Sequence, residues 1–309
     1  MARGPGEPAA RRRLVRLGRG AGNASKRAPR TCVPSALSPA SVHEERLMSA
    51  TPPVRYGAWI TLNSTVLTEQ VARLGFDFVV VDGQHGLLGY AEIRDSLIAL
   101  TAGGCQLPIA RVSSHDPGEV GRMLDSGAKG IIVPMVNTAE DARRIAQAAR
   151  YPTSGGQRSY SPVRSGDHFG TTPGNTDRGV MILAMIETRT ALEEVSGILD
   201  TPGIDGVFVG PYDLSLALGA TIPFEESVLP ELETALATVA AETLSRGKIA
   251  GIYAGSGEDA ALRASQGYTL VNTTHDLDIL LTGMAGELAA ARASTPSPEA
   301  SHSAESSTR

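Results

Sequence analysis

The sequence is poor in cysteine and in aromatic residues, and it has no long apolar run. Its two cysteines, Cys32 and Cys105, are too few for a disulfide framework and match no zinc-site spacing. The longest apolar stretches fall short of the roughly 18 residues that a membrane span needs. The N-terminus also lacks the apolar core of a secretory signal. These absences predict a cytoplasmic protein with no membrane partner.

Charge is unevenly distributed along the chain. The formal net charge is −5, yet residues 1–47 contain ten Lys or Arg against three acidic residues, so the remainder is strongly acidic. An acidic body argues against nucleic acid as a partner. The basic residues lie in a Pro-, Ala-, Gly- and Arg-rich extension, 1–50, which cannot bury a core and is predicted to be disordered. A start of translation at Met48 is favoured, with an organelle transit peptide as the alternative.

From residue 51 onward, short apolar runs alternate with helical stretches. Aromatic residues make up only 4% of the chain, so Val, Ile, Leu and Ala must fill the core, as in parallel sheets covered by helices. The strands are predicted at 58–62, 76–82, 108–112, 130–136, 180–187, 206–210, 249–254 and 269–274. Helices are predicted at 66–74, 91–101, 117–125, 139–150, 191–199, 214–218, 230–246, 258–265 and 277–292.

This alternation predicts an α/β fold of the TIM type, a (β/α)8 barrel over residues 51–293. A doubly wound open sheet is the alternative, but no Gly-rich dinucleotide fingerprint follows the first strand. Residues 152–179 have no periodicity, and a loop of that length is typically functional or disordered. The polar, low-complexity tail, 294–309, is predicted to be disordered.

Polar side chains follow four of the predicted strands, where catalytic groups of such barrels lie. Asp82 and His85 follow the second strand, and Arg111 ends the third. Glu187 ends the fifth strand, and Asp213 follows the sixth. We therefore expect these five side chains to share one site.

Glu187 and Asp213 are the candidate metal ligands. Two carboxylates in a partly dry site repel each other unless a cation lies between them, and oxygen ligands suit Mg²⁺ or Mn²⁺. The alternative is that one of them caps the helix that follows it.

His85 is a candidate proton acceptor, with Asp82 placed to orient its ring. Arg111 is placed to bind a carboxylate or to stabilise an enolate oxygen. The alternatives are a loop histidine bonded to backbone, and an ion pair of Arg111 with Asp116 or Asp125.

Other candidates have weaker support from the sequence. Trp59 is either a pocket wall or plain core, and the arginines of the long loop, Arg158 and Arg164, either meet an anionic substrate or face solvent. Three further histidines are interpreted as loop or surface residues: His115, His168 and His275.

Six motifs in unbroken order carry a family resemblance. They are WITLNS, GFDFVVVDGQHG, ARVSSHDP, MLDSGAKGIIVPMV, IETRTALE and GIDGVFVGPYDLSLALG. Over residues 56–292 the chain resembles the 4-hydroxy-2-oxoheptanedioate / 2-dehydro-3-deoxyglucarate aldolase family. These are class II, pyruvate-dependent enzymes of the phosphoenolpyruvate/pyruvate barrel superfamily.

The resemblance implies a role for each matching residue. His85 matches the proton acceptor, Arg111 the residue that stabilises the enolate transition state, and Asp125 the acid that raises the basicity of the histidine. The match of Asp125 replaces the interpretation from spacing alone, in which Asp82 orients the ring of His85. The metal ligands match Glu187 and Asp213, and the backbone of Tyr212 matches a substrate contact.

The implied function is a carbon–carbon lyase that depends on Mg²⁺, Mn²⁺ or Co²⁺. It cleaves a 4-hydroxy-2-oxo acid to pyruvate and an aldehyde through a pyruvate enolate held by the metal. The resemblance also implies a homo-oligomer, a trimer or hexamer, in which the last helix packs on a neighbouring subunit. No Schiff-base lysine is expected, since Lys129 and Lys248 precede strands.

Two positions depart from the family pattern. Gln84 stands where relatives often have Glu, and Met185 stands where several have a substrate-binding Gln. Both departures leave the substrate open. The alternative functions are an acyl-CoA lyase of the citramalyl or malyl type, and a non-catalytic protein that binds 2-oxo acids.

Overall fold

The structure is a computed structural model that describes residues 53–294. The predicted basic extension, 1–50, and all but the first residue of the predicted tail, 294–309, lie outside the described residues.

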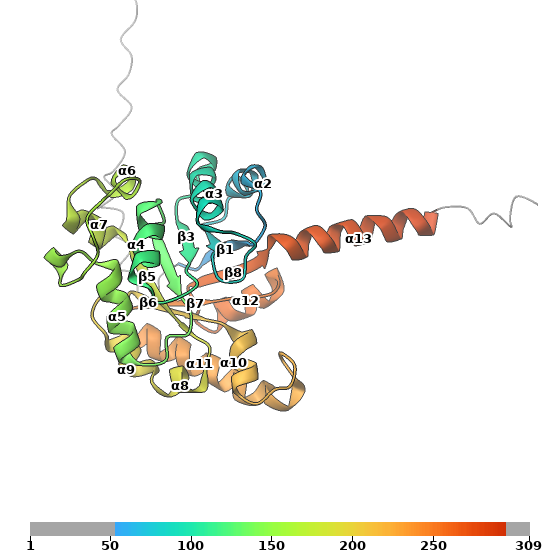
Figure 1. Ribbon diagram of the computed structural model, residues 1–309. Coiled ribbons are helices and arrows are strands. Elements are labelled where there is room, and N and C mark those ends of the chain that lie inside the picture. Colours follow the sequence, from blue (N-terminus) through green and yellow to red (C-terminus); the bar gives the residue numbers. More distant parts are fainter. Residues whose placement is uncertain (1–52, 295–309) are drawn as a thin grey trace, which may run out of the picture. The chain divides into compact units, whose positions relative to one another are not determined.

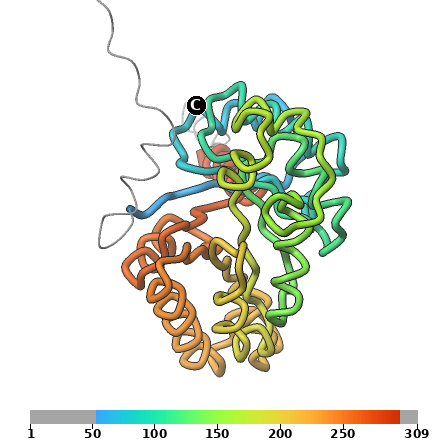
Figure 2. Tube along the Cα trace, turned by 90° about the vertical axis from the view of Figure 1, so that its left-hand side faces the viewer, coloured from blue at the N-terminus to red at the C-terminus, as the bar shows by residue number. Residues whose placement is uncertain are grey.

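Eight parallel strands close into a barrel in chain order, which confirms the predicted (β/α)8 fold. The first strand pairs with both the second and the eighth, so the sheet has no open edge (Figure 1). In the Cα trace, the blue first strand lies beside the orange-red last strand (Figure 2). The strands are β1 (Arg55–Ile60), β2 (Phe78–Asp82), β3 (Pro108–Arg111), β4 (Gly130–Val133), β5 (Met181–Ile186), β6 (Gly206–Val209), β7 (Ile249–Ile252) and β8 (Leu270–His275).

Helices follow every strand, and the predicted alternation is therefore correct. They are α2 (Thr65–Ala72), α3 (Tyr90–Gly103), α4 (Pro117–Asp125), α5 (Ala139–Ala149), α8 (Arg189–Glu193), α9 (Val195–Asp200), α10 (Pro211–Ala217), α11 (Leu229–Ser245), α12 (Gly257–Ser265) and α13 (Asp276–Ser294). A one-turn helix, η2 (Glu226–Val228), precedes α11. Several helices begin at a hydroxyl cap, such as Ser64 before α2 and Thr138 before α5.

The strands are buried on both faces, which explains their continuous apolar runs. In β2, Phe78 and Val80 face the barrel interior, whereas Val79 and Val81 join the core beneath the helices. Three of the few aromatic residues, Trp59, Phe78 and Phe208, fill the interior. A Cβ at Gly57 would lie 2.3 Å from the Phe78 ring, so that position admits only glycine.

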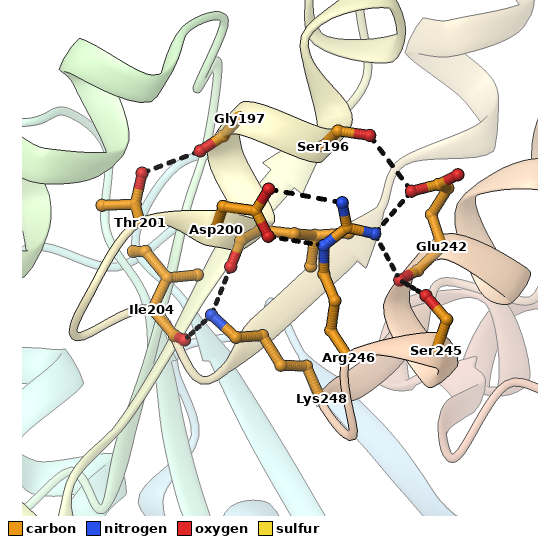
Figure 3. A network of polar contacts seen from close by, with 10 residues as sticks. Ser196, Gly197, Asp200, Thr201, Ile204, Glu242, Ser245, Arg246 and Lys248 are labelled. Atoms are coloured by element: carbon orange, nitrogen blue, oxygen red, sulfur yellow. Dashed lines mark hydrogen bonds and ion pairs between the residues drawn. The ribbon is translucent and has the colours of Figure 1, made fainter.

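The end of the barrel where the strands begin is held by a polar network (Figure 3). Arg246, after α11, donates to both carboxylate oxygens of Asp200 and to the carboxylate of Glu242. Lys248, just before β7, donates to the backbone carbonyls of Leu199 and Ile204. These contacts join α9, α11 and β7.

Two expectations from the sequence need correction. The first strand ends at Ile60 rather than at 62, because the Thr61 and Leu62 amides donate to the Asp276 carboxylate at 2.9 and 3.0 Å. The segment 152–179 is not irregular throughout. It contains η1 (Pro152–Ser154), α6 (Ser165–Phe169) and α7 (Pro173–Gly179).

The last helix, α13, extends away from the barrel, and none of its residues is buried (Figure 1). Its exposed apolar side chains include Ile279, Leu281, Met284 and Leu288. None of the helices between residues 53 and 294 is both long and apolar enough to cross a membrane.

Candidate functional site

A cavity of about 290 Å³ opens at the end of the barrel where the strands finish. Parallel strands bring their carboxyl ends to one rim, so residues far apart in sequence meet there. Its walls come from the ends of β1, β2, β3, β5, β6, β7 and β8. They comprise Trp59, Thr61, Asp82, His85, Arg111, Met185, Gly210, Pro211, Tyr212, Asp213, Tyr253, His275 and Asp278.

Asp82 holds Arg111 rather than the ring of His85. The two residues are register partners on β2 and β3, and Arg111 donates through Nε to Oδ1 at 2.8 Å and through Nη2 to Oδ2 at 2.5 Å. The Trp59 indole donates to Oδ2 at 3.1 Å, and the backbone amide of His85 donates to Oδ1 at 3.2 Å. Asp82 therefore fixes the guanidinium in one orientation.

The ion pair changes the ionisation of Asp82. Burial alone would raise the pKa of this carboxyl, but the hydrogen bonds and charge of Arg111 outweigh burial and lower the pKa below its ordinary 3.8. The predicted alternatives, pairs of Arg111 with Asp116 or Asp125, do not form. Asp116 instead caps α4 by accepting from the Glu119 amide.

Glu187 is buried directly after β5, with an exposed fraction of 3%. Its Oε1 accepts a hydrogen bond from the Met135 amide at 2.6 Å, and it has no cationic partner within residues 53–294. Burial raises the pKa of Glu187, and the negative charge of nearby Asp213 raises it further. The charge of Asp213 therefore acts on Glu187, and a cation shared by the two carboxylates stays a prediction.

The alternative that these carboxylates cap helices is wrong. Thr188 caps α8 by accepting from the Ala191 amide at 3.0 Å. The N-cap of α10 is Gly210, and no side chain bonds to that helix end. A Cβ at Gly210 would lie 2.9 Å from Oε2 of Glu187, so glycine keeps the space beside this oxygen open.

The donor set around Glu187 and Asp213 suits a hard cation only in part. Both residues supply carboxylate oxygens, but the part of the chain that the structure describes has no group of three or more His, Cys, Asp or Glu that could hold a metal. A cation there would complete its coordination with water and substrate. Mg²⁺ commonly binds in this way, through one or two carboxylates.

Asp125 is not brought to this cavity within one chain. It ends α4, at the opposite end of the barrel, where Nη2 of Arg158 donates to its carboxylate at 2.6 Å. Burial raises the pKa of Asp125, and Arg158 opposes the rise. Arg158 is itself buried, 4.7 Å from the Tyr151 ring centroid, and Arg164 donates to the Ser126 carbonyl. Neither arginine lines the cavity.

The remaining candidates lie in the cavity wall. Met185 is buried on β5, and Tyr212 is exposed at the start of α10, with its ring 4.6 Å from that of Phe224. Trp59 is both core and wall, because it is buried and also faces the cavity.

Four wall residues were missed by the sequence analysis, namely Thr61, Tyr253, His275 and Asp278. The interpretation of His275 as a loop or surface residue is wrong, since it ends β8 and faces the cavity. The signal that could have found Tyr253 and His275 is the one that found Glu187, a polar side chain at the end of a strand.

The two lysines of the described chain lie at the opposite end. Lys129 donates to the Gln106 carbonyl, and Lys248 is engaged by two carbonyls (Figure 3). Neither lines the cavity, which agrees with the expectation of no Schiff-base lysine.

Comparison with known proteins agrees with this geometry. The model of the HpcH/HpaI aldolase/citrate lyase family matches residues 55–281. The chain is 39% identical over 236 residues to a hydroxypyruvate/pyruvate aldolase of Rhizorhabdus wittichii, covering 76% of this chain and 93% of the relative. It is 34% identical over 233 residues to a 5-keto-4-deoxy-D-glucarate aldolase of Escherichia fergusonii, covering 74% and 89%.

A solved structure extends the match to the whole barrel. A HpcH/HpaI aldolase/citrate lyase family protein from Burkholderia cenocepacia superposes with a TM-score of 0.73 at 28% identity, covering 82% of this chain and 99% of that one. The chain therefore belongs to the HpcH/HpaI aldolase/citrate lyase family.

Proposed function

We propose that this chain is a divalent-metal-dependent class II aldolase that cleaves a 4-hydroxy-2-oxo acid to pyruvate and an aldehyde. One observation carries the proposal. Asp213 lines a cavity whose wall also includes His85 and Arg111, and Glu187, whose Oε2 lies beside Gly210 of that wall, is affected by the charge of Asp213. Two relatives, a hydroxypyruvate/pyruvate aldolase and a 5-keto-4-deoxy-D-glucarate aldolase, support the same reaction class.

Glu187 and Asp213 would hold the cation, which is Mg²⁺, Mn²⁺ or Co²⁺. When bound, such a cation supplies Lewis-acid polarisation of the 2-oxo group. The Met135 amide donates to Oε1 of Glu187, so Oε2 would be the oxygen available to a cation. Among the described residues, no arginine or lysine forms an ion pair with Glu187, which supports a cationic ligand from outside the chain.

His85 and Arg111 have separate roles in the cleavage. His85 accepts the proton of the C4 hydroxyl, the C3–C4 bond breaks, and its electron pair forms the pyruvate enolate as the aldehyde leaves. A proton added at C3 then gives pyruvate. Asp82 accepts one hydrogen bond each from Nε and Nη2 of Arg111, so the N–H groups of Nη1 and the second N–H of Nη2 are left to stabilise the developing oxyanion.

The role that the resemblance gives to Asp125 requires a second copy of the chain. Asp125 and His85 lie at opposite ends of one barrel, so Asp125 can act on His85 only from a neighbouring subunit. The exposed apolar side chains of α13, such as Leu281 and Met284, support a homo-oligomer, a trimer or hexamer. Light scattering tests the assembly. Mixing inactive His85→Ala and Asp125→Ala chains tests the shared site, because some mixed sites would regain both residues.

We also infer a cytoplasmic location for the mature protein. Cys105 is buried and forms no disulfide, which suits a reducing compartment. Cell fractionation with an antibody against the chain tests this.

A chelation experiment tests the proposed function. The protein is stripped with EDTA, and pyruvate release from 4-hydroxy-2-oxo acids is followed with lactate dehydrogenase. We expect no release until Mg²⁺, Mn²⁺ or Co²⁺ is returned. Turnover that stays undiminished after complete chelation would contradict the metal-dependent mechanism. Binding of oxalate and Mn²⁺ without turnover on any substrate would favour a non-catalytic protein.

A further inference from the structure

The cavity has two chemically different sides. Glu187 and Asp213 follow β5 and β6, whereas β7, β8 and β1 continue the ring from β6 onward. We call the side formed by the ends of β7, β8 and β1, together with Tyr212 of α10, the acceptor wall and define it by five residues: Thr61, Tyr212, Tyr253, His275 and Asp278. If the pyruvyl unit binds at the carboxylate pair, the other half of the substrate faces this wall.

The acceptor wall is held in place by the start of α13. The Asp276 carboxylate accepts from the Thr61 amide at 2.9 Å and from its hydroxyl at 2.6 Å. Two residues later, Oδ2 of Asp278 lies 2.8 Å from Nε2 of His275, and the Asp278 amide donates to Nδ1 at 3.3 Å. Both ring nitrogens of His275 therefore have partners, and the Asp278 carboxylate is fixed at the cavity.

Among the described residues, the acceptor wall contains no arginine or lysine. Arg111 is paired with Asp82 through two hydrogen bonds, and His275 is paired with Asp278. The two lysines of the described chain lie at the other end of the barrel. A second carboxylate on the substrate would meet the negative charge of Asp278, whose side chain is 69% exposed, with no arginine or lysine in the wall to balance it.

The acceptor wall instead presents hydroxyl groups to the cavity. The Tyr253 and Tyr212 hydroxyls carry no hydrogen bond to the described residues, and the two rings lie 5.9 Å apart. Burial raises the pKa of Tyr253, so its hydroxyl stays protonated near neutral pH. A hydroxyl on the substrate can accept from Tyr253 and donate to Asp278.

We propose that the acceptor wall selects an uncharged hydroxyaldehyde as the aldehyde half of the substrate and disfavours an aldehyde that carries a carboxylate. The proposal rests on the proposed aldolase function and names its acceptor class. Tyr253 and Asp278 are the specificity-determining residues. Their discrimination is strongest between molecules that differ only in charge or in one hydroxyl.

Glycolaldehyde and glyoxylate are the matched probes, because they differ only by a hydroxymethyl group in place of a carboxylate. Addition of pyruvate to each is measured as kcat/KM with Mn²⁺ present, and propionaldehyde serves as the apolar reference. We expect wild-type protein to prefer glycolaldehyde over glyoxylate by about tenfold or more. A wild-type preference for glyoxylate overturns the proposal.

Two variants assign the preference to the wall. Asp278→Asn removes the negative charge and should lower the glycolaldehyde-to-glyoxylate ratio by about tenfold. Glu287→Gln removes a charge farther along the same helix, on an exposed side chain, and should leave the ratio unchanged. Tyr253→Phe should slow glycolaldehyde addition by about tenfold and leave propionaldehyde unaffected. An unchanged ratio in Asp278→Asn together with equal effects of Tyr253→Phe on both aldehydes contradicts the proposal.

Failure of the aldolase function itself has a different signature. Exchange of the pyruvate methyl protons with deuterated water needs no aldehyde. Exchange with the wrong acceptor preference overturns only the acceptor class. Absence of exchange together with absence of addition to any aldehyde overturns the proposed function, and this inference with it.

Discussion

Charged side chains have different partners at the two ends of the barrel. Where the strands begin, Arg246 is shared between Asp200 and Glu242, and Lys248 is surrounded by carbonyl oxygens (Figure 3). Where the strands finish, Glu187 is buried with only a backbone amide as partner, and a second carboxylate lies nearby.

This difference separates stability from function. A network in which Arg246 is paired with two carboxylates and Lys248 with two backbone carbonyls holds α9 to α11 and needs no ligand to complete it. A buried carboxylate that faces another negative charge lowers the stability of the folded protein when no ligand is bound. Sites that keep such a destabilising arrangement are candidates for ligand binding. The comparison therefore predicts that substitutions at one end affect catalysis and those at the other affect folding.

The largest effect is expected for Glu187→Gln. If Glu187 holds the cation, its loss removes several kcal/mol of charge stabilisation, or roughly a 10³-fold fall in kcat/KM for pyruvate release. Unfolding by urea should show equal or greater stability without metal, because burial and Asp213 no longer oppose a charge there. The exposed Glu193→Gln on α8 is the matched control, with activity near wild type. Equal activity of the two variants would remove the proposed metal site.

Asp82→Asn tests a residue that belongs to the functional end of the barrel but, unlike Glu187, is paired with an arginine. Removing it leaves Arg111 buried without its partner and should lower the free energy of unfolding by roughly 3 kcal/mol at pH 7. The folded-state pKa of Asp82 is lowered, so its stabilisation is present above the ordinary value of 3.8 and is lost as pH falls through the folded value.

Urea titrations across pH measure this effect. The gap between wild type and Asp82→Asn should stay constant down to about pH 3.8 and narrow below it. Asp95→Asn breaks a more exposed pair with Arg94 and provides the control. A gap that widens on acidification would show that the pair does not stabilise the charged form of Asp82.

Lys248→Met tests the other end of the barrel. The carbonyls of Leu199 and Ile204 lose their donor, and the free energy of unfolding should fall by about 1–3 kcal/mol. The kcat should stay within about twofold of wild type, because the side chain does not reach the cavity. Loss of activity in a stably folded Lys248→Met protein would instead implicate this amine in catalysis.

The smallest effect is expected at Met135, beside Glu187. Its φ of 56° is left-handed, a conformation that glycine adopts without strain. Met135→Gly should raise the free energy of unfolding by about 0.5 kcal/mol and keep the amide that donates to Glu187. Met135→Ala keeps the strain and should show no gain. Thermal unfolding of the two variants measures the difference.

The sequence predicted the barrel well because apolar runs such as residues 78–81 carry a local signal. It also predicted that Glu187 and Asp213 would lie close together, since both follow strands of one parallel sheet. It did not predict the partner of Arg111. That pairing with Asp82 depends on the register of β2 against β3, which no local pattern encodes.

Other errors have the same origin in long-range contacts. The first strand ends early because Asp276, more than 200 residues away, binds the Thr61 amide. Residues 152–179 appeared irregular because their order comes from distant partners, such as the pair of Arg158 with Asp125. His275 was interpreted as a loop or surface residue because its partner, Asp278, lies in α13 and the sequence does not indicate that the start of this helix reaches the cavity.

The central claim is that the carboxylate pair at the end of β5 and β6 supports enolate formation from pyruvate. Proton NMR of pyruvate in deuterated water measures this step without any knowledge of the aldehyde. We predict methyl-proton exchange that requires Mn²⁺ or Mg²⁺, disappears in Glu187→Gln and persists in Lys248→Met. Exchange that continues in Glu187→Gln under EDTA, or no exchange by metal-loaded wild-type protein, would contradict the account.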